Sequence, residues 1–225
     1  MKTFVFPMLA VVMGLSACAG GGPDVMRSDR TQMTLATQGP GAAVEPVRQV
    51  LAAQYDVEDI RISVPSKLKV SEANMFYPVA DIVWRGEPMG NRHAQVMSIF
   101  KEAMDRGTHT MTTGRKVLVD IEVERFHSVT EKTRYTVGGT HSMRFTLTVR
   151  DAATGMVIDG PRLVAADAKA AGGAQAVAEE QMGRTQRVVV VERLASAIRS
   201  ELSARVTDPM LISRALSQPS DVTLR

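Results

Sequence analysis

The sequence has 225 residues, of which 44% are hydrophobic and 23% are charged, as expected for an ordinary globular protein of about one domain. The 27 basic and 24 acidic residues leave a net charge of only +3, which argues against a dedicated nucleic-acid binder. The single cysteine excludes an intrachain disulfide and a cysteine-based metal site.

The N-terminus has the features of an export signal. Lys2 supplies a positive charge, and the apolar run 4–14 is too short to remain in a bilayer as a permanent helix. The letters LSAC follow at positions 15–18, and small residues come after them. This string resembles the lipobox of bacterial lipoproteins, in which a leucine and two small residues precede a lipidated cysteine.

The resemblance implies that Cys18 carries lipid and that residues 1–17 are a signal peptide removed before it. Several acyl chains hold a protein firmly at a membrane, because each buried methylene contributes about 0.8 kcal/mol. An aspartate after the cysteine would favour retention in the inner membrane. Ala19 stands there instead and favours the outer membrane, with the domain facing the periplasm and inner-membrane retention as the alternative. The alternative is an ordinary secretory signal with a chance cysteine.

Three further regions follow the lipobox. Residues 18–43 are rich in small and polar residues and predict a flexible tether. Residues 44–217 predict a single domain, and residues 218–225 predict a loose tail. The domain is expected to open with a helix, because a proline at position 46 precedes apolar residues at helical spacing up to Gln54.

The first half of the domain continues with strands and a helix. Alternating apolar residues predict a strand over 60–64, and an apolar run predicts another over 79–84. Residues 90–107 predict an amphipathic helix that ends at Gly107. Its expected apolar stripe comprises Val96, Met97, Phe100, Ala103 and Met104.

The second half contains the clearest strands. Residues 117–126 and 137–150 alternate between apolar and polar side chains, as in a sheet with one covered face. Acidic residues on the first strand and basic residues on the second suit cross-strand pairing. Residues 128–136 are a polar, hairpin-like connection, and a shorter strand is expected over 163–169.

A long helix is expected from Gly172 to about Val206, followed by a short helix over 210–217. The valines at 188–191 cannot all face one core, so this helix is either deeply covered or meets a partner. The element order predicts an α/β (α+β) two-layer sandwich, with helices packed on one face of a mainly antiparallel sheet. A parallel crossover through the 90–107 helix could place Ile82 beside Ile121.

The sequence offers little catalytic chemistry. His93, His109, His127 and His141 have no metal-binding spacing and are read as solvent-facing, so no metal and no cofactor is expected. The carboxylates between Asp120 and Glu124 share a strand face and could serve a hydrolase. A solvated strand face explains them better, and the protein is expected not to be an enzyme.

Two short strings are candidates for a partner surface. Trp84 and Arg85 stand where a strand ends before a helix, and the tryptophan either anchors the core or marks a binding edge. Lys132, Arg134 and Tyr135 lie in the connection between the two long strands and could touch a lipid headgroup or a partner, although a plain hairpin tip fits as well.

Residues 81–170 resemble the ABC-transport auxiliary lipoproteins, through Trp84, the helix after it and the strands 119–126 and 145–151. The whole chain resembles an uncharacterised lipoprotein family of proteobacteria. The resemblance implies a non-catalytic binding, assembly or transport-accessory module, whose partners are the membrane and an envelope transport or assembly protein. The alternative is a structural lipoprotein that contacts peptidoglycan or an outer-membrane protein.

Overall fold

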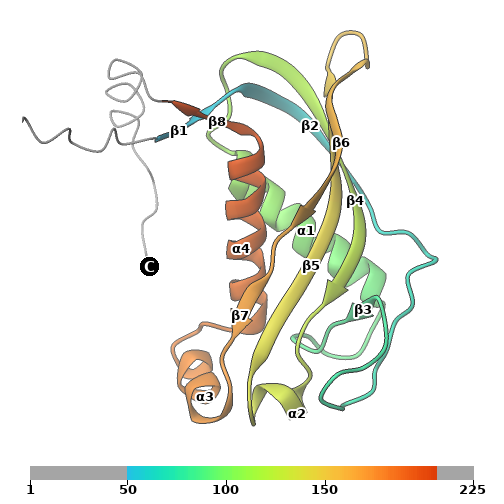
Figure 1. Cartoon of the computed structure of the whole chain (residues 1–225), viewed down its shortest axis with the longest axis vertical. Helices are drawn as coiled ribbons and strands as arrows, with labels where there is room; N and C mark the ends of the chain where they lie inside the picture. Colours follow the sequence, from blue (N-terminus) through green and yellow to red (C-terminus); the bar gives the residue numbers. More distant parts are fainter. Residues whose placement is uncertain (1–49, 207–225) are drawn as a thin grey trace, which may run out of the picture. The chain divides into compact units, whose positions relative to one another are not determined.

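The structure, a computed structural model, describes residues 50–206 (Figure 1). The expected signal peptide, tether, short helix over 210–217 and tail all lie outside these residues. The elements are, in chain order, β1 (Val50–Ala53), β2 (Tyr55–Ser63), β3 (Ile82–Val83), α1 (Arg92–Thr108), β4 (Arg115–His127), α2 (Glu131–Arg134), β5 (Gly139–Asp151), β6 (Val157–Ala165), β7 (Ala168–Ala170), α3 (Gly173–Gln181), α4 (Gln186–Glu201) and β8 (Ser203–Val206).

The main sheet has the strand order β2-β4-β5-β6, with β3 paired to the far end of β4 and β7 paired to β5. The strands β4, β5 and β6 form an antiparallel meander, whereas β2 and β3 run parallel to β4. The predicted parallel crossover through α1 is therefore confirmed, but its register is not. Ile82 lies beside Phe126, and Ile62 occupies the place beside Ile121.

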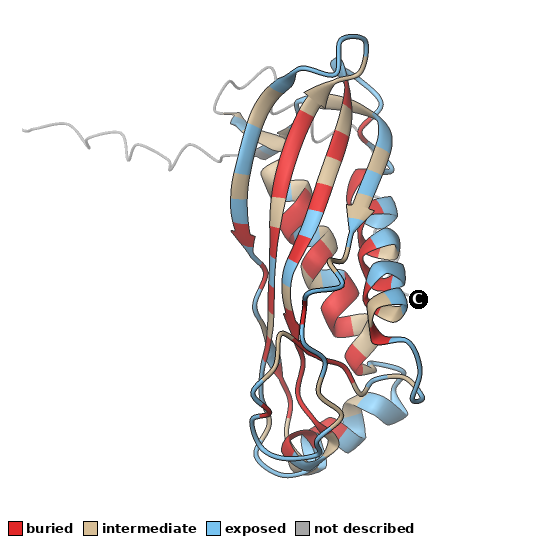
Figure 2. Ribbon diagram, turned by 90° about the vertical axis from the view of Figure 1, so that its right-hand side faces the viewer, coloured by how far each residue is buried: buried red, intermediate tan, exposed pale blue. Residues whose placement is uncertain are grey.

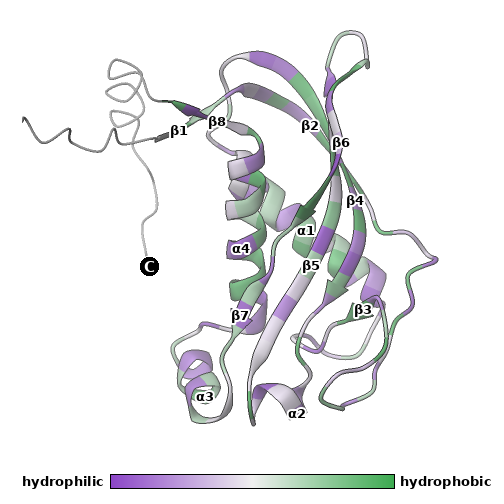
Figure 3. Ribbon diagram, viewed as in Figure 1, coloured by the Kyte–Doolittle hydropathy of each residue, from purple (hydrophilic) through white to green (hydrophobic). Residues whose placement is uncertain are grey.

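The two long strands expose one face and bury the other, as their alternation predicts (Figures 2 and 3). The helices α1 and α4 cover the buried face, which confirms the two-layer fold class with an antiparallel-rich, open sheet. The side chains of β4 and β5 beneath the helices are Val117, Val119, Ile121, Val123, Met143, Phe145, Leu147 and Val149.

Helix α1 confirms the amphipathic helix expected over 90–107. Asn91 caps its first turn by accepting a hydrogen bond from the Ala94 N–H group. The helix is rotated slightly from the predicted stripe, because Ile99 is buried whereas Met97 is exposed. Gly107 lets α4 approach closely, since a Cβ atom there would lie 3.0 Å from the carbonyl oxygen of Ala195.

The single long helix expected from Gly172 to Val206 is wrong. The chain forms α3 and α4, and it turns between them at Gly183, whose φ of +81° suits glycine. Thr185 then caps α4 by accepting a hydrogen bond from the Val188 N–H group. Of the four valines, 189, 190 and 191 are buried and 188 is partly buried, so α4 is deeply covered within this chain.

The helix expected to open the domain is also wrong. Residues 50–53 form β1, which pairs with β8 in a separate two-stranded sheet. Backbone pairing with a distant segment cannot be read from the spacing of a few apolar residues, and it outweighs that spacing here. The strand expected over 79–84 is reduced to β3, and the strand expected over 163–169 is divided between β6 and β7.

Candidate interaction surface

The segment between β2 and β3 forms a loop that closes on itself beside the end of β4. The N–H group of Ser71 donates to the carbonyl oxygen of Ile82 at 3.0 Å, and the N–H group of Ile82 donates to that of Lys69 at 2.9 Å. These bonds fix the base of residues 72–80, which we call the tip loop. A loop held at its base presents its side chains in a defined arrangement.

The carbonyl groups of the tip loop are bound by side chains from β4 and from the segment around α2. The hydroxyls of Thr130 and Thr133 donate to the carbonyl oxygens of residues 75 and 76 at 2.8 and 2.9 Å. The Nε2 atom of His127 donates to the carbonyl oxygen of Pro78 at 2.9 Å, which fixes the tautomer of that ring. These bonds hold the backbone of the tip loop in place, the Tyr77 ring stacks on His127 at 4.6 Å between centroids, and Pro78 is buried.

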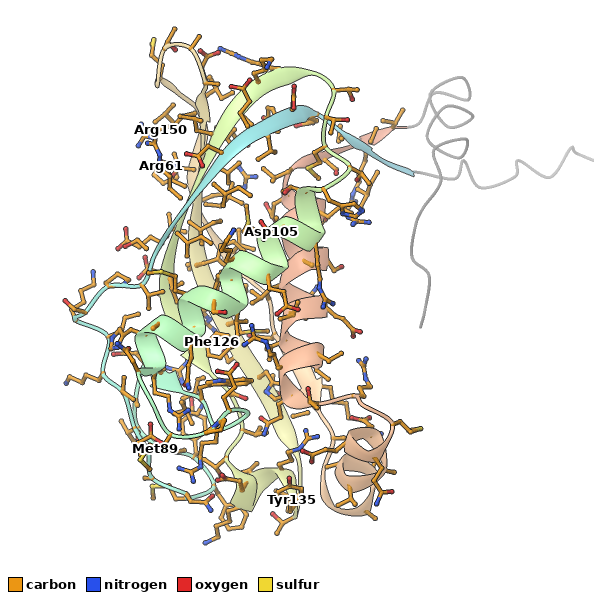
Figure 4. The ribbon with its side chains drawn as sticks, turned by 180° about the vertical axis from the view of Figure 1, so that it is seen from behind. Arg61, Met89, Asp105, Phe126, Tyr135 and Arg150 are labelled. Carbon is orange, nitrogen blue, oxygen red and sulfur yellow. The ribbon has the colours of Figure 1, made fainter. Side chains whose placement is uncertain are left out.

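The exposed side chains of the tip loop are apolar. Met75 is 50% exposed, Phe76 52%, Tyr77 65% and Val79 96%. Further exposed apolar residues stand on the neighbouring loops, and Figure 4 labels Met89 and Tyr135 among them at this end of the sheet. We call the set the apolar end; it comprises Met75, Phe76, Tyr77, Val79, Met89, Tyr135 and Val137. Single exposed apolar residues are common, but a group of this kind marks an interaction surface.

Cationic groups lie among these apolar side chains. The Nζ atom of Lys132 stands 4.7 Å from the centre of the Phe76 ring, which is a cation–π contact. Arg125 donates a hydrogen bond to the Tyr77 hydroxyl at 2.8 Å. Within residues 50–206, neither of these cations pairs with a carboxylate. No carboxylate in this part of the chain therefore offsets the charge of Lys132 or Arg125 by direct contact.

Two of the acidic groups nearby are engaged by arginines behind the loop, whereas Asp81 at its base accepts the backbone N–H group of Lys69. Glu72 accepts hydrogen bonds from Arg92, the nearest at 2.6 Å, and these bonds lower the pKa of its carboxyl group. Glu131 accepts a hydrogen bond from Arg85, which raises the pKa of that guanidinium. Because Arg92 is almost fully buried, this network ties the tip loop to the start of α1.

A second polar cluster lies buried beneath α2. The Ser128 hydroxyl is 2.7 Å from Nδ1 of His141 and donates to the side-chain carbonyl of Gln186 at 2.9 Å. Burial, and to a smaller extent the charge of Arg134, lower the pKa of His141 to about 4. The interpretation of these strand histidines as solvent-facing is wrong for His127 and His141, which are both buried.

The five residues proposed from sequence for a partner surface divide into two groups. Trp84 is fully buried, with its ring edge-on to Phe126 at 5.5 Å between centroids, and it anchors the core. Arg134 is also buried and lies 3.7 Å from Glu180, so the expectation that it is exposed is wrong. Arg85 is occupied by its carboxylate partners.

Lys132 and Tyr135 remain exposed and belong to the same end as the tip loop. Sequence reasoning missed the tip loop itself, because it assigned no role to residues 75–78 of the run from Met75 to Val79 and took Val79 as the start of a strand. Pro78 within this run was a usable signal, because proline has no N–H group for a sheet ladder.

The uncovered face of the sheet carries the carboxylates between Asp120 and Glu124, which are the candidate residues for a hydrolase. A shallow hollow of about 340 Å³ lies over Asp120 and Glu122 and is also lined by Arg61, Arg150 and the hydroxyls of neighbouring strands. Asp120 accepts a hydrogen bond from Arg150 at 2.6 Å, which confirms the predicted cross-strand pairing. No cluster of three or more metal-ligating side chains occurs in the part of the chain that the structure describes.

The comparisons with known proteins identify a family. Residues 55–217, well over half of the chain, match the sequence model of a family of unknown function, DUF6778. The chain belongs to the DUF6778 family. No curated protein matches this DUF6778 chain significantly. None of the helices between residues 50 and 206 is long and apolar enough to cross a membrane.

Two solved structures resemble this DUF6778 protein at a distance. A protein of the DUF330 family from Xanthomonas campestris is 12% identical, with a TM-score of 0.41, over 67% of this chain and 84% of that one. A protein from Caulobacter crescentus that is named as a lipoprotein candidate is 16% identical, with a TM-score of 0.30, over 64% of this chain and 86% of that one. Likeness at this level carries no argument about function.

Proposed function

We propose that this DUF6778 protein is a lipid-anchored envelope lipoprotein that acts as a non-catalytic binding or assembly module and makes contact through its apolar end. The proposal places it in the outer membrane, facing the periplasm. The observation that carries the binding role is the tip loop, because its backbone is held by side chains from β4 and the α2 region while its apolar side chains stay exposed. Loops with bound backbones and exposed apolar side chains suit recognition, since little conformational entropy is lost on contact.

The lipid anchor is supported by the lipobox, whose cysteine at position 18 is the only one in the chain. The described structure begins with β1, and β2 follows directly. The first residues of β2 pair with the first residues of β4. The tip loop lies beside the other end of β4, thirteen residues away. At about 3.3 Å per residue, roughly 40 Å separates the apolar end from the start of β4.

Metabolic labelling tests the anchor. Cells that express the full chain and grow with labelled palmitate should incorporate label into the protein, because the Cys18 sulfur would accept the lipid. Cys18→Ala should lose all the label, whereas the neighbouring substitution Ser16→Ala should retain it. Label that persists in Cys18→Ala would disprove lipidation at this residue.

Site-specific photocrosslinking tests the binding role. A photoreactive amino acid at Val79 should capture an envelope component in cells, whereas the same group at Met156, 69% exposed in the turn between β5 and β6, should not. Equal capture from both positions would contradict a role for the apolar end.

The competing candidate is a structural lipoprotein that contacts peptidoglycan, and the open polar face of the sheet favours it. Ser63, Thr146 and Thr148 place hydroxyls beside charged groups around the hollow, as contact with a sugar–peptide polymer would need. Sedimentation with purified sacculi separates the two candidates. Retention that depends on Thr146 and Arg150, and not on Val79, would favour the structural role.

A further inference from the structure

The exposure, the residue types and the charges of the apolar end together indicate the kind of surface that it binds. Its side chains project outward, and Val79 is 96% exposed. The residue types are Met, Phe, Tyr and Val, with a tyrosine hydroxyl that keeps a polar partner at 2.8 Å. Aromatic and aliphatic side chains of this kind settle at the boundary between headgroups and acyl chains, where one end of a tyrosine stays wet.

The charges around the tip loop complete the pattern. Lys132 lies over the Phe76 ring, Arg125 donates to the Tyr77 hydroxyl, and Lys69 stands at the base of the loop. Lys69, too, makes no ion pair within the residues that the structure describes. Of the nearby acids, Glu72 and Glu131 are engaged by Arg85 and Arg92, Glu180 lies 3.7 Å from Arg134, and Asp81 accepts the backbone N–H group of Lys69. Exposed cations beside apolar side chains complement a lipid surface with anionic headgroups.

We infer that the apolar end docks on a lipid bilayer containing anionic lipids, with Phe76, Tyr77 and Val79 at the acyl boundary and Lys132 among the headgroups. The inference rests on the proposed function and names the partner of the same surface. A bilayer adapts to projecting side chains, whereas a protein partner would need a matching groove for each of them. The rigid backbone of the tip loop keeps the three side chains together, so they enter as a unit.

The test uses the full, lipidated protein in vesicles of phosphatidylcholine with or without phosphatidylglycerol. If lipid occupies the Cys18 sulfur, Val79→Cys supplies the only free thiol, and a fluorophore attached there reports on the tip. The matched control is Met156→Cys, an exposed apolar position in the turn at the other end of β5. Lipid-borne spin labels should quench the fluorophore at 79 in anionic vesicles, whereas aqueous iodide should quench the one at 156.

The charge requirement has its own variant. Lys132→Gln keeps an uncharged side chain of similar length and should weaken docking about fivefold, the loss expected for one basic residue at an anionic surface. Lys101→Gln, on the exposed side of α1 and paired with Asp105, should leave docking unchanged. Docking that is the same with and without phosphatidylglycerol would contradict the role assigned to the cations.

The outcomes separate this inference from the proposed function. Palmitate labelling together with a residue-79 fluorophore that iodide still reaches would overturn bilayer docking and leave the lipoprotein proposal standing. Photocrosslinking from residue 79 to a protein, without lipid quenching, would also overturn bilayer docking, and it would identify a protein as the partner. Lipid quenching at residue 79 in a chain that carries no palmitate would uphold docking and overturn the anchor.

Discussion

At the scale of single residues, Gly86 shows how tightly the chain passes over Trp84. A Cβ atom at position 86 would lie 2.4 Å from Cη2 of the buried indole, and the φ angle of Gly86 is one that alanine can adopt. Gly86→Ala should therefore destabilise the fold by about 1–3 kcal/mol through overpacking. Urea unfolding measures the change.

Gly90→Ala is the matched control, because the nearest atom to its new Cβ would be the side-chain amide of Gln95 at 3.3 Å, at the end of an unbranched side chain and not in a buried ring. It should change the free energy of unfolding by less than the substitution at position 86. Equal effects at the two glycines would show that the indole can move aside.

His141 makes stability depend on pH. Its pKa falls from the ordinary value of 6.5 to about 4 because burial disfavours the charged ring, and the cationic Arg134 acts in the same direction. The folded state thus prefers the neutral imidazole. The resulting stability is complete above pH 6.5 and is lost progressively as the pH falls towards about 4.

A shift of this size corresponds to roughly 3 kcal/mol between the two limits. Urea unfolding between pH 7 and pH 5 should show the onset of the loss, in a range where most carboxylates stay ionised. In His141→Gln the slope over this range should become smaller, whatever the absolute stability of the variant. A slope that is unchanged would assign the pH dependence to other groups, among which His127 also has a lowered pKa.

At the scale of elements, the tip loop and α2 depend on each other. Thr133→Val replaces the hydroxyl that donates to the carbonyl oxygen of Phe76 with a methyl group of the same size. The freed carbonyl should cost about 1–3 kcal/mol locally. Amide hydrogen exchange should become faster in residues 72–80 and stay unchanged in β5.

Thr146→Val is the control for this experiment, since its exposed hydroxyl donates only to Glu124 on the neighbouring strand. It should leave exchange in the tip loop as it was. If the loop of Thr133→Val exchanges at the normal rate, the remaining bonds from Thr130 and His127 are sufficient to hold it.

At the scale of the whole molecule, the sequence predicts the layers better than the ends of the elements. The alternation of β4 and β5 and the stripe of α1 follow from burial on one face, which is a local pattern and is visible in the chain. The β1–β8 pair and the break at Gly183 depend on contacts between distant segments, so spacing alone predicted helices there.

The candidate site was found only in part for the same reason. Lys132 and Tyr135 are polar or amphipathic and lie in a connection, so their exposure could be expected. Trp84 and Arg134 are equally prominent in the sequence, yet they are buried. Met75, Phe76, Tyr77 and Val79 are apolar or aromatic, yet they are exposed, and the hydrogen bonds to the carbonyl groups of the loop that hold them there join residues distant in the sequence.

The parallel pairing of β2 with β4 also has a mechanical consequence. Tension between residue 50 and the tip loop would run along β2, which is paired with β4 from Tyr55 to Ser63, and β4 is in turn paired with β5 over residues 117–127. When force acts parallel to the strands, many hydrogen bonds must break at once. When force acts perpendicular to them, the bonds break one after another. The sheet is therefore oriented to resist stretching between its two ends.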